Sequence, residues 1–314
     1  MISELGLSRS DLVIVHTTDR IIAALSIAIE AMQQADSPIF IIRFVDMIPI
    51  GHGIDDAHIR LAKLQKSRSN VLVFSETDET AKSLIDQYGY SLVQPWIMPL
   101  ASQATSKMVK TGDPDKEFVV GFLGGKRAEQ QPGYIPELAR LLISSKDRWP
   151  VEKFTFLVQS VSPGIKRPEE FQSAMKALNL ILADQTDDHF SVEMLPSVMD
   201  EAEFDDAISR SHLLVLPYNV QNYGGRGSGL VIEAALSGTP IAVPEGFAMR
   251  RWTELADAPV CTDCNEYAEA ILEVAGNYES YLKSAANAGE KLRSFIDHRI
   301  TEIRSLNAET SPAR

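Results

Sequence analysis

The segment 213–246 constrains the fold most, because it contains a short apolar run, a glycine-rich loop, a helix-like stretch and a second apolar run in that order. The runs LLVLP and PIAVP have the length of buried strands, whereas LVIEAAL has helical spacing and ends before Ser-Gly. A strand, a helix and another strand in succession form the unit of a parallel α/β sheet. The loop NVQNYGGRGSG then lies at the carboxyl end of a strand and the amino end of a helix, where free backbone N–H groups suit an anion. The segment therefore predicts a site for a nucleotide or sugar phosphate, with Glu233 facing the same crevice.

Length and charge limit the broad class of protein. The 314 residues are enough for two ordinary domains, and a hydrophobic fraction of 45% is typical of globular proteins. The formal charge of −13 argues against a nucleic-acid partner, because such proteins usually carry a basic face. No window approaches the roughly 18 apolar residues that a membrane span needs. The first residues, MISELGLSRSDL, lack the apolar region of a secretory signal, so we expect a cytoplasmic protein.

The two cysteines form a single CTDC motif at Cys261 and Cys264. The flanks of a redox motif are missing, so a strand end followed by a helix start is favoured over redox or metal chemistry. No group of His, Cys, Asp and Glu has metal-ligand spacing, and the pair Asp187-Asp188 stands in a polar loop that is typical of a solvated turn. The sequence also lacks a nucleophile elbow and a Walker loop. We therefore expect neither a metal ion nor a resident cofactor.

Apolar periodicity predicts strands that alternate with helices in two successive segments. In the first segment the expected strands are 12–16, 39–44, 71–74 and 92–94, and the expected helices are 21–33, 55–66 and 77–88. Ser75 is the expected N-cap of the third of these helices, with Asp78 completing a variant capping box. In the second segment the expected strands are 118–123, 154–161, 191–195, 213–217 and 240–244, with a short one at 260. Helices are expected at 134–145, 168–178, 201–210 and 249–255, and two more within 278–306.

Residues 101–117 separate the two segments; they are polar, contain Gly and Pro and lack periodicity, which predicts a linker. Two runs of alternating strands and helices predict an α/β protein with two Rossmann-like, doubly wound domains that face a cleft. His16 and Asp46 follow predicted strands of the first segment, so both would face that cleft. Each is a candidate for positioning an acceptor hydroxyl, against the simpler interpretation of a structural residue at a strand end.

Two motifs of the second segment resemble the donor-binding domain of GT-B glycosyltransferases, specifically family 4 (glycosyl transferases group 1). The first is a glycine turn with nearby cations at 124–129, followed by Gly133-Tyr134. The second, more specific motif consists of Pro217-Tyr218, Arg226-Gly227-Ser228-Gly229, Glu233-Ala234 and Gly238-Thr239-Pro240. The likeness covers about residues 118–306. The segments 11–16, 41–46 and 71–75 resemble later strands of the family's amino-terminal domain, whose usual first strands have no counterpart upstream.

The resemblance implies a division of the chain and of its functions. Residues 1–100 correspond to a shortened, Rossmann-like acceptor-side domain, 101–117 to a linker, 118–296 to the donor domain, and 297–314 to a carboxy-terminal helix and tail. It implies transfer of a sugar from a nucleotide-diphosphate sugar to a carbohydrate or lipid-linked acceptor, with retention and without a metal. The family often builds surface polysaccharide, which allows a peripheral membrane contact. The sequence does not predict the oligomeric state.

The donor site can be assigned residue by residue. A guanidinium can bind phosphate oxygens in a bidentate manner, so Arg127 is the first candidate for the diphosphate, against the alternative of a solvated loop residue. Glu233 would accept from ribose or sugar hydroxyls, against the alternative that it only complements the helix dipole. The backbone N–H groups of residues 227–229 would bind the phosphates. The other donor-site candidates are Gly125, Lys126, Arg226, Gly227, Ser228, Gly229 and Tyr218.

Two departures from the family pattern leave other functions open. Gln130-Gln131-Pro132 stands where the family has a lysine after the arginine, and Gly225 stands where it often has a second glutamate, eight residues before Glu233. One alternative is a catalytically silent or partner-dependent protein that binds a nucleotide sugar on the same fold. A sugar epimerase or a phosphorylase with the GT-B fold is another, although the sequence shows no phosphorylase cofactor site.

Overall fold

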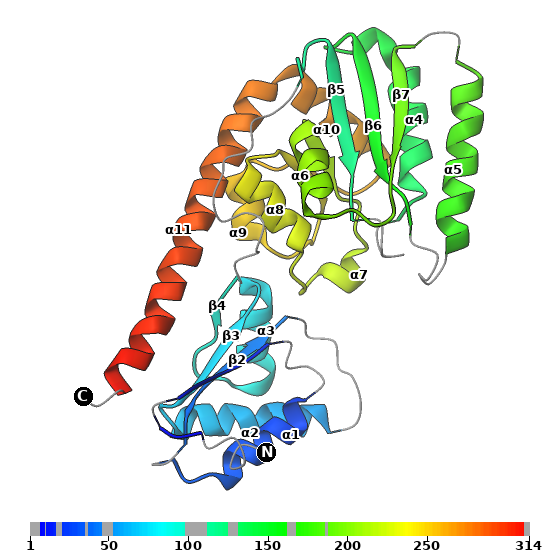
Figure 1. The fold of residues 1–314 in the computed structure, drawn as a ribbon. Helices are drawn as coiled ribbons and strands as arrows, with labels where there is room; N and C mark the ends of the chain where they lie inside the picture. Colours follow the sequence, from blue (N-terminus) through cyan, green and yellow to red (C-terminus); the bar gives the residue numbers. More distant parts are fainter. Residues whose placement is uncertain are drawn as a thin grey trace. The chain divides into compact units, whose positions relative to one another are not determined.

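The computed structural model describes residues 7–9, 11–16, 21–34, 37–45, 53–97, 112–124, 131–161, 168–185 and 188–310, without the side chains of Asn222 and of residues 307–310. The chain forms two compact units. Unit 1 consists of Met1–Pro99, Gly224–Gly227 and Ser294–Arg314, and unit 2 of Leu100–Tyr223 and Ser228–Arg293. Each unit contains a sheet with helices packed against it (Figure 1). Most of the linker expected at 101–117 lies outside the described residues.

Unit 1 contains a four-stranded parallel sheet with the order β1-β2-β3-β4. Its strands are β1 (Leu12–Val15), β2 (Ile39–Phe44), β3 (Val71–Ser75) and β4 (Gln94–Pro95), and its helices are α1 (Ile22–Ala31), α2 (Ile54–Ser67) and α3 (Asp78–Tyr88). Each new strand is added to the sheet on the same side of the previous one. Right-handed crossovers therefore bring the three helices to one face. The carboxyl ends of all four strands therefore meet at one edge of the sheet.

Both faces of this sheet are buried. Phe40, Ile42 and Phe44 of β2 pack against α1, α2 and α3. Ile39 and Ile41, on the alternate positions, pack in a second cluster with Phe74, Trp96 and Ile303. Ile303 belongs to the last turns of α11 (Tyr278–Thr310), so the end of the chain covers the face that the three helices leave open. This burial on both sides explains the continuous apolar run IFII in the sequence.

The N-cap expected for α3 is wrong by two residues. Ser75 is the last residue of β3, and its hydroxyl donates to the carbonyl of Thr77 at 2.8 Å. Thr77 is the cap, because its side chain accepts from the backbone N–H of Thr80 at 3.0 Å. A strand that continues one residue further than expected moves the start of the helix along the chain.

Unit 2 contains a six-stranded parallel sheet with the order β10-β9-β8-β5-β6-β7. The strands are β5 (Glu117–Phe122), β6 (Lys153–Gln159), β7 (Phe190–Leu195), β8 (Leu213–Val215), β9 (Ile241–Pro244) and β10 (Val260–Cys261). Counted from its own first strand, this order is 3-2-1-4-5-6, the doubly wound Rossmann arrangement. The direction of winding reverses between β5 and β8, and open α/β sheets bind their ligands at the carboxyl side of such a reversal.

Helices cover both faces of the second sheet (Figure 1). They are α4 (Tyr134–Ser144), α5 (Pro168–Ala183), α6 (Glu201–Arg210), α7 (Val220–Tyr223), α8 (Gly229–Ser237), α9 (Arg250–Leu255) and α10 (Cys264–Gly276). α4, α5 and α10 share one apolar core with the sheet, in which Phe118, Phe154 and Phe156 are buried. α6 and α8 contact each other on the opposite face. The α/β fold with parallel sheets that the sequence predicts is confirmed.

One helix, α11, replaces the two helices that the sequence predicts within 278–306. The stretch contains no proline, and its single glycine, Gly289, does not interrupt the helix. A Cβ at Gly289 would lie well inside van der Waals distance of the Ala235 carbonyl oxygen in α8. Gly289 therefore permits close packing of two helix backbones rather than a turn. The short helix α7 was also not predicted, since four residues are too few for a periodic signal.

Candidate functional site

The reversal between β5 and β8 places two chain segments of unit 2 at one crevice. After β5 the backbone turns at Gly124, whose φ of 85° is in the left-handed region that favours glycine. The Gly124 N–H donates to the Gln159 side chain at 2.7 Å, and Gln159 is buried at the end of β6. After β8 the carbonyl of Pro217 accepts from the side chain of Gln131 at 3.1 Å. Side-chain amides thus fix the backbone on both sides of the crevice.

Tyr218, in the loop after β8, packs among other aromatic side chains. It is 3% exposed and stacks on Tyr223, with ring centroids 4.3 Å apart and an interplanar angle of 10°. Phe247 lies against both rings. The Tyr218 hydroxyl lies 3.3 Å from the hydroxyl of Ser228. Tyr218 also lines a pocket of unit 2, so its assignment to the donor site stays a prediction.

The loop ends at Ser228, the N-cap residue of α8, which makes no side-chain capping bond. The Ser228 N–H donates to the sulfur of Met249 at 3.2 Å, so this amide, one of three expected to bind phosphate, already has an acceptor. Sulfur is a weak acceptor. For the next three N–H groups, those of Gly229, Leu230 and Val231, the described residues provide no acceptor. These orphan donors and the positive end of the helix dipole make the start of α8 suited to an anion.

Glu233 lies one turn beyond Gly229 on the same side of α8, because residues four apart on a helix are neighbours. Apart from Glu233, every residue of the helix from Leu230 to Ser237 is buried. Gly229 is exposed and Glu233 is half-buried. Glu233 stands in the second turn of α8. An acid at the one accessible position of α8 after Gly229, one turn from the orphan amides, suits a ligand that offers hydroxyl groups close to a phosphate.

A pocket of about 310 Å³ lies beyond the carboxyl ends of β8, β9 and β10 in unit 2. Its polar lining residues include Gln131, Asn219, Gln221, Glu245, Thr262 and Tyr267. Cys261 also lines it; burial, together with nearby acidic groups, raises the pKa of this thiol to about 12. The same causes raise the pKa of Cys264 to about 11. Both thiols are free and protonated at neutral pH, which makes them poor nucleophiles.

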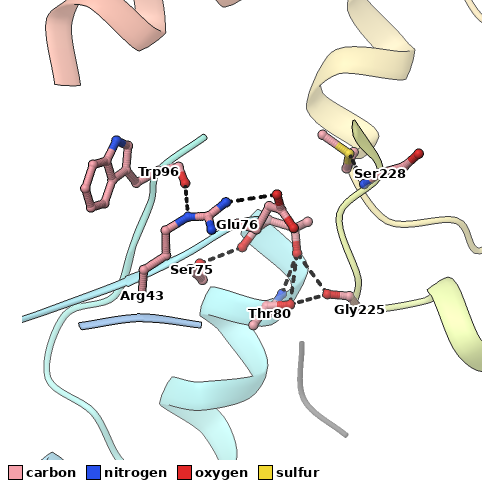
Figure 2. Close-up of polar contacts among 9 residues, drawn as sticks. Arg43, Ser75, Glu76, Thr80, Trp96, Gly225 and Ser228 are labelled. Carbon is pink, nitrogen blue, oxygen red and sulfur yellow. Dashed lines mark hydrogen bonds and ion pairs between the residues drawn. The ribbon is translucent and has the colours of Figure 1, made fainter. Parts of the chain in front are cut away.

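A second polar group lies at the carboxyl edge of the sheet in unit 1. Arg43, in β2, forms an ion pair with Glu76 at 2.9 Å, and the two side chains are only 6% and 12% exposed. The Arg43 Nε donates to the Trp96 carbonyl at 2.8 Å (Figure 2). His16 follows β1 with its ring 5.6 Å from that of Trp96, and desolvation and the Arg43 charge lower its pKa. The ion pair was not predicted, although a charged residue inside the apolar run IFIIRF is a signal for one.

The loop Gly224–Gly227 belongs to unit 1, and α3 holds it there. The Thr80 hydroxyl donates to the Gly225 carbonyl (Figure 2). The Thr77 hydroxyl lies 3.3 Å from the same oxygen. Arg226 is half-buried in this loop, and Gly227 lies against the carboxylate of Glu76. Gly227, predicted to bind the donor, thus lies against Glu76, and its neighbour Gly225 contacts Thr77 and Thr80; these three residues of unit 1 were not predicted.

Several predicted residues lie outside the described part of the chain, namely Asp46, Gly125, Lys126 and Arg127. Their assignments stay predictions. Among the described residues, no group of three or more His, Cys, Asp or Glu side chains is placed to hold a metal ion. None of the helices in this part of the chain combines the length and the hydropathy that crossing a membrane requires.

Comparisons with known proteins gave matches only among solved structures. No family profile and no curated protein matches the sequence. A trehalose-6-phosphate structure from E. coli bound with UDP-2-fluoro glucose superposes with a TM-score of 0.69 at 11% identity, over 96% of this chain and 74% of that chain. A structure of trehalose-6-phosphate synthase, studied for glycosyltransfer with retention, gives 0.67 at 11% identity, over 97% of this chain and 76% of that chain.

A structure of TarM gives a TM-score of 0.55 at 13% identity; it matches 90% of this chain, which spans only 58% of the length of TarM. At these identities the likeness concerns the fold. The order of the second sheet, the two parallel α/β units and these neighbours agree, and the chain has a Rossmann-like GT-B fold that is shortened relative to its structural neighbours.

Proposed function

We propose that this protein is a glycosyltransferase that takes a sugar from a nucleotide-diphosphate sugar. The observation that carries the proposal is the start of α8, where three backbone N–H groups without acceptors among the described residues precede the one accessible acid of a buried helix. A diphosphate fits the amides, and the hydroxyls of a ribose or sugar fit Glu233. The structural neighbour bound with UDP-2-fluoro glucose supports a ligand of this kind.

The start of α8 would act mainly on the leaving group. Breaking the bond between the sugar and the diphosphate leaves negative charge on the phosphate oxygens, and the N–H groups of Gly229, Leu230 and Val231 would stabilise it. Lys126 and Arg127, which follow β5 in the sequence, would add positive charge at the phosphates. Because these cations would neutralise the leaving group, the proposed transfer needs no metal ion. Glu233 would hold the donor in register through its hydroxyls. Retention at the anomeric carbon belongs to the same proposal, supported by the neighbour studied for that stereochemistry.

The acceptor is proposed to be a carbohydrate or a lipid-linked sugar. One structural neighbour was solved in complex with glucose-6-phosphate, which supports a sugar acceptor. His16, at the carboxyl edge of the unit 1 sheet, and Asp46 are the residues proposed to contact it. We also propose that the chain belongs to family 4 and that it is a cytoplasmic protein of surface polysaccharide synthesis with a peripheral membrane contact. Residues 1–100 are proposed as the acceptor domain and residues 118–296 as the donor domain.

The test is a calorimetric titration with UDP-, GDP- and ADP-sugars, followed by the variant Glu233→Gln with the preferred donor. Hydrogen bonds to a charged group contribute about 1.5–3 kcal/mol, so we expect Kd to rise about 10- to 150-fold. Glu290→Gln, at an exposed position of α11, is the matched control and should leave Kd unchanged. Unchanged binding in Glu233→Gln would exclude this site. Tight binding without turnover would favour the silent binding protein, and donor turnover without acceptor would favour an epimerase.

A further inference from the structure

The loop Gly224–Gly227 makes polar contacts in unit 1 that the proposed function does not explain. The residues before and after it, up to Tyr223 and from Ser228, belong to unit 2, so the chain enters unit 1 for four residues only. The next residue is the N-cap of α8, and the orphan amides begin directly after it. Any contact that fixes this loop therefore also acts on the backbone that leads into the proposed donor site.

Two hydroxyls of unit 1 hold the loop by its backbone. Thr80 is fully buried in the first turn of α3, and its hydroxyl donates to the carbonyl of Gly225. Thr77, the cap of the same helix, places its hydroxyl 3.3 Å from that carbonyl and 3.0 Å from the Thr80 hydroxyl. Neither contact depends on the side chain of the loop residue. They fix the position of the main chain itself.

The carboxylate of Glu76 restricts the loop at Gly227, two residues after Gly225. A Cβ on Gly227 would lie well inside van der Waals distance of the Glu76 carboxyl group. Glu76 cannot easily give way, because Arg43 binds its other carboxylate oxygen at 2.9 Å and is itself held by the Trp96 carbonyl. The φ angle of Gly227 is not positive, so an alanine is compatible with the backbone there. Glycine is required at this position for space rather than for conformation.

We propose that Thr80 and Glu76 are positioning residues for donor binding, which hold the loop 224–227 so that the amides of α8 are presented to the diphosphate. The proposal rests on the proposed function and assigns the residues that prepare its site. Ordering a loop before the ligand arrives removes an entropic cost from binding, so the expected result of loosening it is weaker affinity. Neither residue needs to touch the donor.

The first experiment compares Thr80→Val with Thr301→Val, which removes a hydroxyl bonded only within α11. Trypsin can cut after Arg226, inside the loop, so the rate of cleavage between Arg226 and Gly227, followed by mass spectrometry, reports loop opening without any ligand. One hydrogen bond contributes about 1 kcal/mol, so Thr80→Val should raise this rate, and the Kd for UDP-glucose or the preferred donor, about fivefold. Thr301→Val should change neither, and both variants should keep the wild-type Tm within a few degrees.

The second experiment tests the steric contact. Gly227→Ala should weaken donor binding and speed the cleavage after Arg226, because the new methyl group displaces the loop from the Glu76 carboxylate. Glu76→Asp retains the charge on a side chain that is one methylene shorter. The double variant Glu76→Asp, Gly227→Ala should therefore recover part of the lost affinity. A general loss of stability in unit 1 would instead make the double variant worse than either single variant.

The outcomes separate this proposal from the proposed function. If the wild-type protein binds no nucleotide sugar, the proposed function fails and the link to donor binding fails with it, while the cleavage rates still decide whether Thr80 and Glu76 hold the loop. If the wild-type protein binds a donor but Thr80→Val leaves both Kd and cleavage unchanged, only the positioning proposal is overturned. Faster cleavage with unchanged Kd would also overturn it, because the loop would then be held without effect on binding.

Discussion

Acid should weaken the fold of unit 1 through His58, which lies in α2 and is 6% exposed. Its ring stacks on Tyr88 with centroids 4.2 Å apart and lies 5.1 Å from Phe44, and its Nδ1 lies 3.0 Å from the hydroxyl of Tyr90. Burial lowers the pKa of His58 from 6.5 to about 4, against a smaller opposing effect of Asp55. The neutral ring is thus the form that the folded protein accommodates.

The direction of the effect follows from proton binding. Above pH 6.5 His58 is neutral in the folded and the unfolded chain and does not affect stability. Between pH 6.5 and about 4 the unfolded chain takes up a proton that the folded chain does not, so the free energy of unfolding falls as the pH falls. The difference between 6.5 and about 4, at 1.36 kcal/mol per pH unit, amounts to about 3 kcal/mol.

The assay is urea unfolding of the wild-type protein and of His58→Asn at a series of pH values from 7.5 to 4. Asparagine does not titrate and can keep a polar atom near Tyr90. At neutral pH the variant should be less stable, because it loses the stacked ring; towards pH 4 the difference should shrink by about 3 kcal/mol. Other titrating groups contribute to both proteins and cancel in the difference. A difference that stays constant over this range, or an NMR titration of the His58 ring near pH 6.5, would refute the reasoning.

Three further predictions concern packing, the ion pair and the thiols. Gly289→Ala should lower the free energy of unfolding in urea by about 2 kcal/mol, since α11 must move away from Ala235; an unchanged midpoint would contradict that close approach. Arg43→Met should lower the free energy of unfolding by about 3 kcal/mol, because Glu76 is left buried without its partner. A loss below about 1 kcal/mol, the size typical of a solvent-exposed ion pair, would contradict this reasoning. At pH 8 a disulfide reagent should modify Cys264 in the native protein much more slowly than in urea, because its pKa is raised to about 11; equal rates would contradict the burial.

The positions of most helices and strands could be predicted from the sequence. The helix at 201–210 and the strand at 39–44 have the predicted bounds, because each has a clear local period. The misses have physical causes that lie outside the local window. The single helix α11 depends on what Gly289 contacts in α8, and the cap at Thr77 depends on how far β3 extends along its neighbour.

The candidate site was predicted in part. The strand–loop–helix unit with Glu233 was placed correctly by pattern, because its glycines and its helical spacing are consecutive in the chain. The sequence assigned phosphate binding to the amides of residues 227–229. Of these, the Ser228 amide bonds the Met249 sulfur, twenty-one residues later, whereas the Gly229 amide has no acceptor among the described residues, and phosphate binding stays a prediction. Tyr218, a candidate for the ligand, stacks on Tyr223 and also lines the pocket of unit 2, and its part in donor binding stays a prediction.

The sequence by itself determined the alternation of strands and helices and the loop that opens α8, because periodicity and glycine content act over a few residues. Tertiary structure alone decided that winding reverses between β5 and β8, since strand order depends on pairing between distant segments. It also joined Arg43 to Glu76 and Thr80 to Gly225, which are 33 and 145 residues apart. Such contacts form only after the sheet has brought the strand ends together, and no local pattern records them.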